Sequence, residues 1–286
     1  MRRRFFAICC SLIFMFLMSS PINGAEERAA INFDTPICLR VNDTYLKLDS
    51  EPFLYQGTTF VPIRFVSEAL GADSVKWDAQ NKKATIILGN KNIELTAGSN
   101  YAYVNGKKVK TEQSVRLVNN RTYVPVRFVS ENLGCSVNWD SSSYTVNIYK
   151  SGVSVPVHLT GNRGYNDDEI YWLSKIINAE SSGEPMQGKI AVGNVILNRV
   201  ESRSFPNTIY GVIFDRNFGV QFSPVSDGSI YKTPLGDSVI AAKRALRGEK
   251  TAGKSLYFLN PKKASSSWII NNRIYHKTIA NHDFYL

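Results

Sequence analysis

Hydrophobic residues recur at helical spacing through residues 167–180, where Ile170, Leu173 and Ile177 fall on one face. We expect this face to pack into the core of a domain. Glu180 follows Ile177 by three positions, so its side chain is expected beside the buried face rather than on the solvent face. A glutamate in that position is unusual, and it is a candidate for chemistry.

Residue types at both ends of this segment predict where the helix begins and ends. Asn166 or Asp167 is expected to cap its N-terminus, and the glycine of the segment 181–183 is expected to end it. Pro185 suits the first turn of a following helix, where its missing N–H removes no hydrogen bond. That second helix is predicted over residues 186–200 and is apolar almost all round, as expected at the centre of a domain.

Two interpretations of Glu180 follow from this placement. Partial burial raises the pKa of a carboxylic acid, which can then hold a proton near neutral pH and act as a general acid. Alternatively, a glutamate at a helix end makes a capping contact or a salt bridge, since perturbed carboxylates are often structural. Taken alone, the local pattern favours the structural interpretation.

The N-terminal half contains an internal repeat. The segment T-T-F-V-P-I-R-F-V-S-E-A-L-G-A-D-S-V-K-W-D at 58–78 recurs as R-T-Y-V-P-V-R-F-V-S-E-N-L-G-C-S-V-N-W-D at 121–140, which indicates a duplicated unit. Each copy predicts a strand, a short helix that begins at proline and stops at glycine, and a tryptophan-bearing strand that leads into a hairpin. A further hairpin is predicted around Asn105-Gly106. We therefore expect a small, strand-rich α+β domain.

The second half predicts helices first and a small sheet last. Residues 151–166 contain glycine, serine and proline without a helical period and predict a linker. A short helix is expected at 208–214, a functional loop at 215–235, and a helix from 238 to 247 whose N-cap is Asp237.

Alternating residues in the tail predict the small sheet. They occur around Leu256–Leu259 and Trp268–Tyr275, with a turn at Asn271-Asn272 between two strands. We expect Trp268 to lie in the core of this sheet rather than against a ligand.

The first twenty-five residues have the pattern of a signal peptide. Three arginines precede an apolar run from Phe5 to Met18, and small residues surround a cleavage point after Gly24 or Ala25. The apolar run is shorter than the ~20 residues that span a bilayer. We therefore expect a secreted protein that has no membrane contact after cleavage.

The chain is basic, with a formal net charge of +10. Signal cleavage would remove three arginines and lower this charge to +7, with most of the excess in the second half. A basic exported protein suits a polyanionic cell wall, and export favours the wall over nucleic acid as the partner. A basic protein without a polyanionic partner is the alternative. Of the cysteines that remain, Cys38 and Cys135 are expected as buried thiols, with one disulfide as the alternative.

The repeated V-P-x-R-F-V-S-E-x-L-G residues resemble the copper amine oxidase N-terminal-like domain over residues 36–150. The resemblance implies a module of wall-associated secreted bacterial proteins that binds the cell-wall surface or acts as a spacer. It does not imply oxidase activity, because copper needs three histidine ligands and the histidines here, His158, His276 and His282, all lie outside the repeat. We expect no metal and no cofactor.

Five motifs occur in order within residues 167–286: I-I-N-A-E-S-S-G-E-P-M-Q-G-K-I-A-V-G-N-V-I-L-N-R-V, S-F-P-N-T-I-Y-G-V-I-F, Q-F-S, Y-F-L-N-P and A-N-H-D-F. Together they resemble the SleB/CwlJ cell-wall hydrolase family, which includes spore cortex-lytic enzymes. The resemblance implies a lysozyme-like α+β catalytic domain, peptidoglycan as substrate and Glu180 as the catalytic acid. Ser181-Ser182 replaces the Ala-Arg of many relatives, which leaves the contacts beside the acid open.

The implied reaction cleaves the glycan between N-acetylmuramic acid and N-acetylglucosamine, which requires a proton for the leaving oxygen. A lytic transglycosylase needs only one glutamate, whereas a hydrolase would use a second carboxylate about 5 to 9.5 Å away. We expect the transglycosylase, on spore cortex or vegetative wall. The alternatives are a muramidase-type hydrolase, an N-acetylmuramoyl-L-alanine amidase and a non-catalytic wall-binding protein.

Further residues are expected around the sugar by the same resemblance. Glu184 is expected to support the loop or the second helix rather than to act as a second carboxylate. His282 is expected to orient a neighbour or to have a structural role rather than to bind metal. The full set of expected substrate-binding residues is Glu184, Gln221, Phe222, Tyr257, Asn260, Asn281 and His282.

Overall fold

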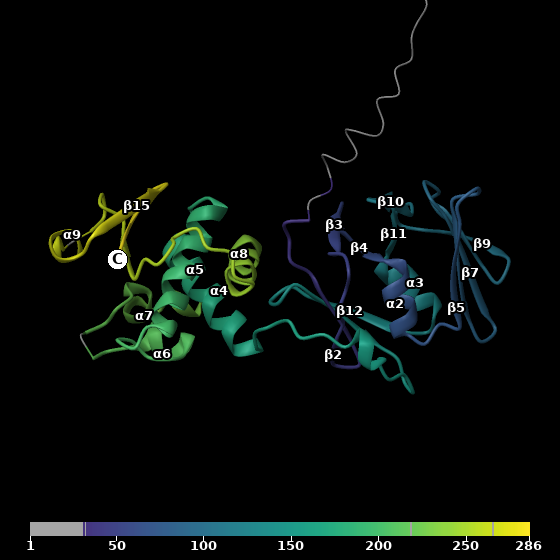
Figure 1. Ribbon diagram of the computed structural model, residues 1–286, viewed down its shortest axis with the longest axis horizontal. Coiled ribbons are helices and arrows are strands. Elements are labelled where there is room, and N and C mark those ends of the chain that lie inside the picture. The colour runs from purple at the N-terminus through teal and green to yellow at the C-terminus, as the bar shows by residue number, and fades with distance from the viewer. Residues whose placement is uncertain (1–30, 32, 218, 265) are drawn as a thin grey trace, which may run out of the picture. The chain divides into compact units, whose positions relative to one another are not determined.

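The computed structural model describes residues 31, 33–217, 219–264 and 266–286, and the predicted signal peptide lies outside them. These residues form a strand-rich N-terminal part and a helical C-terminal part that ends in a small sheet (Figure 1), so the predicted α+β class is confirmed. None of the helices in these ranges combines the length and the apolar character that a membrane crossing requires.

The N-terminal part is built from short strands. They are β1 (Cys38–Val41), β2 (Thr44–Tyr45), β3 (Phe53–Tyr55), β4 (Thr58–Pro62), β5 (Ser74–Asp78), β6 (Lys83–Leu88), β7 (Lys91–Thr96), β8 (Tyr101–Val104), β9 (Lys107–Lys110), β10 (Arg116–Val118), β11 (Arg121–Pro125), β12 (Ser136–Asp140) and β13 (Thr145–Tyr149). They pair in the orders β12-β13-β1-β2, β10-β11-β4-β3 and β5-β6-β7-β8-β9.

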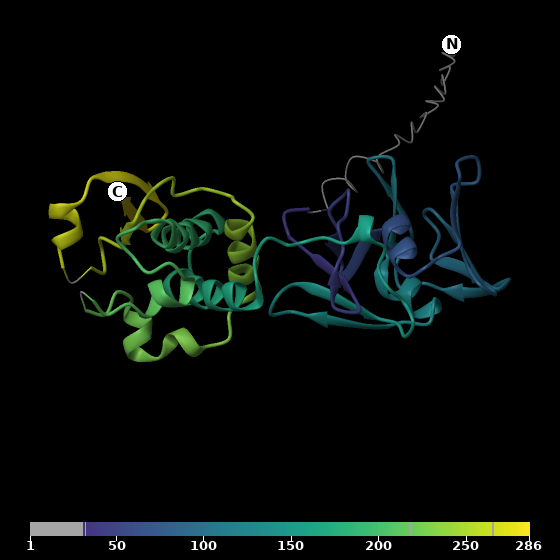
Figure 2. The ribbon, with the colours of Figure 1, turned by 60° about the horizontal axis from the view of Figure 1, so that its bottom comes forward.

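The two repeat copies meet at equivalent positions. Strands β4 and β11 pair antiparallel with Val61 opposite Val124, which are matching residues of the two copies. Each strand leads directly into a short helix, α2 (Ile63–Ala69) or α3 (Val126–Asn132), and each helix begins after a proline. The views agree that α2 and α3 lie side by side (Figures 1 and 2). The predicted duplication is therefore confirmed.

The turn chemistry of the N-terminal part also follows the prediction. Asn105 and Gly106 join β8 to β9 with φ values of 50° and 78°, the left-handed pair that a tight hairpin turn requires. Cys38 and Cys135 are both buried and unbonded to each other, which confirms two thiols rather than a disulfide.

The predicted linker, residues 151–166, makes backbone contacts with the N-terminal part. It contains a single helical turn, η1 (Val157–Leu159), and Thr160 forms a bridge with Leu46. Gly161 is packed so tightly on this edge that a Cβ there would meet the Lys47 nitrogen at 2.7 Å. This stretch is therefore anchored to the N-terminal part by backbone pairing in its second half.

The C-terminal part consists of helices and a three-stranded sheet of order β14-β16-β15. Its elements are α4 (Asp167–Ser181), α5 (Met186–Glu201), α6 (Ile209–Phe214), α7 (Ser223–Asp227), η2 (Ser229–Tyr231), α8 (Gly236–Leu246), β14 (Tyr257–Leu259), α9 (Trp268–Asn272), β15 (Tyr275–Ile279) and β16 (His282–Tyr285).

Helix α5 packs against both α4 and α8 (Figures 1 and 2). The three helices meet at Gly193, where a Cβ would contact the Ile177 side chain at 2.9 Å and the Ala245 Cβ at 3.3 Å. Because glycine has no side chain there, the helices can pack with little space between them. The prediction of a central apolar helix is confirmed.

Helix α4 begins as predicted. Asn166 accepts a hydrogen bond from the Glu169 backbone at 2.8 Å, and the Glu169 side chain accepts one from the Asn166 backbone at 2.7 Å. This reciprocal pair satisfies two N–H groups that a helix end otherwise leaves free. The helix continues through Ser181, so Glu180 lies in its last turn.

Three predictions for the second half are wrong in detail. Residues 215–235 contain α7 and η2 rather than a long loop. Residues 268–272 form the helix α9 rather than a strand, and Trp268 is 51% exposed rather than in the core. Asp237 lies in the first turn of α8 and pairs with Lys189 at 3.0 Å, while the cap position is Leu235. None of the residues of α9 is buried, so the alternation of residue types in this segment does not correspond to a buried and an exposed face of a strand.

Candidate active site

The C-terminal part contains a cavity of about 1550 Å³ between the end of α4, the region before α7, and the sheet β14-β16-β15. All the residues predicted for the site line it: Glu180, Glu184, Gln221, Phe222, Tyr257, Asn260, Asn281 and His282. The structure thus brings together side chains that the sequence spreads over a hundred positions.

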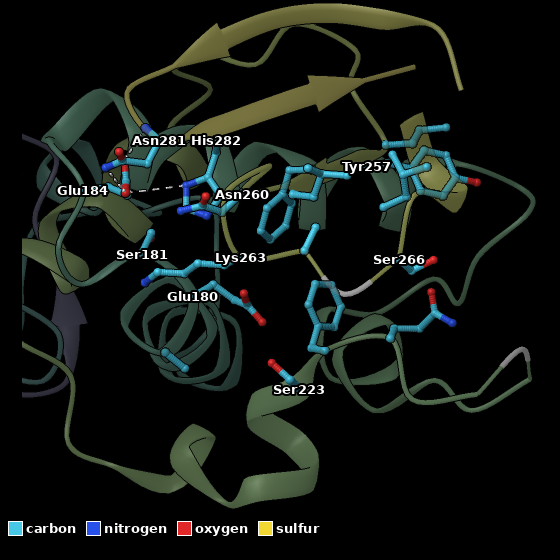
Figure 3. A pocket seen from close by; sticks show the side chains of 18 of the residues that line it. Glu180, Ser181, Glu184, Ser223, Tyr257, Asn260, Lys263, Ser266, Asn281 and His282 are labelled. Carbon is cyan, nitrogen blue, oxygen red and sulfur yellow. Dashed lines mark hydrogen bonds and ion pairs between the residues drawn. The ribbon is translucent and has the colours of Figure 1, made fainter. Parts of the chain in front are cut away.

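Glu180 directs its carboxylate into this cavity (Figure 3). The residue is half-buried in the last turn of α4. Within the described ranges, no group caps this carboxylate or forms a hydrogen bond or ion pair with it. The structural interpretation of Glu180 requires a capping contact or a salt bridge, and the described residues provide neither.

Burial raises the pKa of Glu180 to about 7, and the negative charge of Asp227 adds to the rise. A carboxylic acid with this pKa is protonated in a large fraction of molecules at neutral pH, as a general acid requires. Asp227 itself has a pKa below its ordinary value, because Ser229 hydrogen-bonds its carboxylate. Asp227 is therefore ionised at neutral pH, whereas Glu180 is protonated in a large fraction of the molecules.

The chain turns away immediately after Glu180. The Ser181 side chain is buried and donates a hydrogen bond to the Ile177 carbonyl at 2.6 Å, and the Glu184 backbone N–H bonds the Ser181 carbonyl at 2.9 Å. Ser181 is thus occupied by the backbone of its own helix. Ser181 therefore stabilises the C-terminal end of α4, and the Glu180 side chain beside it remains free to line the cavity.

Glu184 is held by the turn between β15 and β16. Its carboxylate accepts hydrogen bonds from the backbone and side chain of Asn281, at 3.1 and 3.0 Å, and lies 3.8 Å from Nδ1 of His282 (Figure 3). Burial acts to raise the pKa of Glu184, but the hydrogen bonds from Asn281 and the neighbouring His282 and Lys189 outweigh it, so this pKa is lowered. Glu184 is therefore ionised and ties the last hairpin to the start of α5.

His282 is buried beside this carboxylate. Burial lowers its pKa, although Glu184 acts in the opposite direction. Its ring packs edge-on against Phe258 at 5.5 Å. Within the described ranges, no three His, Cys, Asp or Glu side chains gather as a metal site. The neighbours of His282 are those of a neutral, packed imidazole.

The remaining predicted residues differ in how free they are to bind a ligand. Phe222 is only 4% exposed and packs near Phe258, so it forms part of the cavity floor. Asn260 accepts a hydrogen bond from the Lys262 backbone at 3.0 Å, and Gln221 donates one to the Gly219 carbonyl at 3.2 Å. These two amides keep unused donors or acceptors for a ligand.

Several cavity residues were not predicted from the sequence: Arg199, Ser223, Lys262, Lys263, Trp268 and Arg273. A signal for Arg199 exists in the sequence, because it falls three residues after Ile196 on the buried stripe of α5. An arginine on a buried stripe requires an explanation, since buried charges are rare without a partner. Arg273 follows a short exposed helix, and no comparable pattern marks it.

Comparison with known proteins matches both halves of the chain. The sequence model of the family described as Cell Wall Hydrolase matches residues 183–285, and that of the Copper amine oxidase N-terminal domain matches residues 40–148. These matches confirm the two resemblances expected from the motifs. Glu180 lies three positions before the matched range, while Glu184, Asn281 and His282 lie within it.

Individual relatives agree with these families. A spore cortex-lytic enzyme of Bacillus cereus is 39% identical over 142 residues, 48% of this chain and 51% of that protein. The cell wall hydrolase CwlJ of Oceanobacillus iheyensis is 30% identical over 106 residues, 35% of this chain and 74% of that protein. A solved structure of the catalytic domain of the germination-specific lytic transglycosylase SleB from Bacillus anthracis is 41% identical, with 44% of this chain and 100% of that one covered at a TM-score of 0.40. The chain spans about half the length of the first of these relatives.

Proposed function

Because the chain belongs to the cell wall hydrolase family, we propose that its C-terminal part cleaves the glycan strand of peptidoglycan between N-acetylmuramic acid and N-acetylglucosamine, as a lytic transglycosylase. The observation that carries the proposal is a single uncommitted carboxyl group, Glu180, with a raised pKa in a cavity large enough for several sugar rings. The curated relatives named as spore cortex-lytic enzymes support spore cortex as the wall that is cut during germination.

The chemistry needs one residue in two roles. Glu180 gives its proton to the bridging oxygen as the bond between that oxygen and C1 of N-acetylmuramic acid breaks, and N-acetylglucosamine leaves with the new hydroxyl. The Glu180 carboxylate then takes the proton of the muramic 6-hydroxyl as that oxygen bonds to C1. The strand ends in a 1,6-anhydro ring, and Glu180 is protonated again.

The state of Glu184 favours this mechanism over hydrolysis. A hydrolase uses a second carboxylate to activate water or to attack C1. Among the described residues, Glu184 is the other carboxylate that lines the cavity, and Asn281 donates hydrogen bonds to both of its oxygens. Asp227 affects Glu180 electrostatically, but it is exposed and caps the Ser229 backbone at 2.8 Å.

Mass spectrometry of the fragments released from purified peptidoglycan tests the proposed reaction. We expect strands that end in 1,6-anhydro-N-acetylmuramic acid. Reducing N-acetylmuramic ends without anhydro products would instead establish a muramidase-type hydrolase. Release of free peptide from intact strands would establish an amidase, and binding without any release would leave a wall-binding protein. Parallel digestion of spore cortex and vegetative wall would identify the preferred substrate.

We further propose that the protein is exported and that the N-terminal part binds the wall through the exposed face of its five-stranded sheet. Tyr101 and Tyr103 on β8 are each 45% exposed on this face. Across the sheet, Tyr103 stands opposite Lys108, whose ammonium lies 4.2 Å above the Tyr101 ring. Aromatic rings beside lysines suit a sugar polymer that carries anionic groups.

A double substitution tests this face. In a chain made inactive by Glu180→Gln, adding Tyr101→Ala and Tyr103→Ala is expected to weaken sedimentation with purified wall by on the order of tenfold, because two stacking surfaces are lost. The matched control is Tyr149→Ala, which removes a 40% exposed tyrosine from another sheet and is expected to bind normally. Equal binding by all three chains would contradict the assignment.

A further inference from the structure

Two arginines lie against the same aromatic ring in the cavity wall. The guanidinium carbon of Arg199 is 5.3 Å from the centre of the Tyr257 ring, and that of Arg273 is 4.5 Å from it. Arg199 comes from the last turn of α5 and Arg273 follows α9, so distant segments of the chain converge here. Among the described residues, neither arginine forms an ion pair with a carboxylate.

Arg199 is nearly inaccessible, at 5% exposed, although it lines the cavity. Its Nε donates a hydrogen bond to the Leu256 carbonyl at 2.7 Å, and its guanidinium lies 4.8 Å from the Phe205 ring and 5.2 Å from the Phe222 ring. Its Nη1 is buried and finds no hydrogen-bond partner in the described part of the chain. Burial lowers the pKa of Arg199 to about 10, so it remains charged at neutral pH.

Arg273 repeats this pattern from the other side. Its Nε is also buried without a hydrogen-bond partner within the described ranges, and its guanidinium lies 4.8 Å from the Trp268 ring. Buried donors without partners are rare and costly in folded proteins. Two of them beside one ring in an open cavity indicate that a ligand supplies the missing acceptors.

Arg199 and Arg273 gather at the Tyr257 ring, whereas Lys263 lies on the side of the cavity where Glu184 and His282 are found. Among the described residues that line the cavity, the carboxylates are Glu180 and the hydrogen-bonded Glu184. Asp215 affects Arg199 electrostatically but lies beyond ion-pair distance. Figure 3 shows Tyr257 across the cavity from Glu184, Asn281 and His282, with the Glu180 carboxylate between the two groups. The Tyr257 end is therefore cationic and separate from the position of the acid.

We propose that Arg199 and Arg273 form a site for a carboxylate carried by the muramic acid residue of the substrate, on its lactyl group or on the attached peptide. The proposal rests on the proposed function and adds the feature by which the cavity selects its substrate. A planar guanidinium presents parallel N–H groups that match the two oxygens of a carboxylate. Trp268, which is 51% exposed beside Arg273, offers a stacking face for the sugar that carries this group.

Calorimetric binding to the Glu180→Gln chain tests the site without turnover. Three probes of equal length are compared: an N-acetylglucosamine–N-acetylmuramic acid tetrasaccharide with free lactyl carboxylates, the same tetrasaccharide with these carboxylates converted to methyl amides, and the peptide-bearing form. We expect one of the two carboxylate probes to bind at least about tenfold more tightly than the amide. The tighter of the two identifies whether the lactyl group or the peptide supplies the carboxylate.

Substitutions assign the preference to the two arginines. Arg273→Gln and Arg199→Gln are each expected to bring the ratio between the carboxylate probe and the amide probe close to one. Arg203→Gln is the matched control, because it removes an exposed arginine just after α5 that does not line the cavity. It is expected to keep the ratio. Arg273→Gln alone decides the matter if the more deeply buried Arg199 cannot be replaced without unfolding.

Two results would overturn the site. One is equal binding of all three probes to the Glu180→Gln chain, and the other is a preference for the carboxylate that survives Arg273→Gln. If the unsubstituted chain nevertheless releases anhydro fragments, the proposed function stands and only the carboxylate site fails. A chain that binds none of the probes and releases no fragments overturns both.

Discussion

Replacing Glu180 by glutamine is expected to lower the rate of peptidoglycan cleavage by on the order of 10²- to 10⁴-fold. Glutamine has nearly the same shape but cannot donate a proton to the leaving oxygen or take one back. Within the described residues, Glu180 has no hydrogen bond or ion pair to lose, so the fold and the binding of wall fragments should be kept. Turbidity loss of purified wall measures the rate, and sedimentation with wall measures the binding.

The pH dependence of the same reaction follows from the raised pKa. Glu180 must carry its proton when the glycosidic bond breaks, so kcat/KM is expected to fall as the pH rises through about 7. Because the charge of Asp227 contributes to the rise, Asp227→Asn is expected to move this fall to lower pH. A Glu180→Gln chain that solubilised wall at the normal rate would refute the assignment of the acid.

Replacing Glu184 by alanine is expected to destabilise the C-terminal part by about 3 kcal/mol at pH 7, because it removes two charge-assisted hydrogen bonds from Asn281. Glu184→Gln, the matched control, keeps one acceptor and should lose about 1 kcal/mol. Urea unfolding monitored by circular dichroism measures both losses.

The pH dependence of the stability that Glu184 contributes distinguishes a supporting role from a catalytic one. The folded protein lowers the pKa of Glu184 below its ordinary value of 4.5, so this contribution to stability is present above that pH and is lost as the pH falls through the folded pKa. The difference between the unsubstituted chain and Glu184→Gln should therefore shrink in acid. Loss of activity in Glu184→Gln without loss of stability would contradict a supporting role and favour a hydrolase with two carboxylates.

Local sequence signals predicted the framework that positions Glu180. The cap at Asn166 and the glycine and proline between the two long helices act through nearby backbone groups, so sequence alone reports them. The sequence also predicts the repeat, because both copies keep the same proline before the short helix and the same glycine after it. The pairing of β4 with β11 was foreseen only as pseudo-symmetry, since its register depends on residues far apart in the chain.

The parts that sequence reasoning missed depend on long-range packing. Trp268 was assigned to a strand because apolar and polar residues alternate there, yet it lies in a short exposed helix beside the cavity. The sequence assigns Arg199 no role, because it lies within an apolar helix. Its place in the cavity depends on Tyr257 and Arg273, which come from distant parts of the chain. The sequence predicts a supporting role for Glu184, but not that Asn281, 97 positions away, donates the hydrogen bond that holds its carboxylate.

The proposed chemistry depends on Glu180 holding its proton near neutral pH in the folded protein. Carbon-13 NMR of the side-chain carboxyl groups, with the Glu180 signal identified by its loss in Glu180→Gln, measures this directly. A titration midpoint near pH 7 is the predicted result. A midpoint near the ordinary value of 4.5 would contradict it, because Glu180 would then be almost fully ionised at neutral pH and could not serve as the acid.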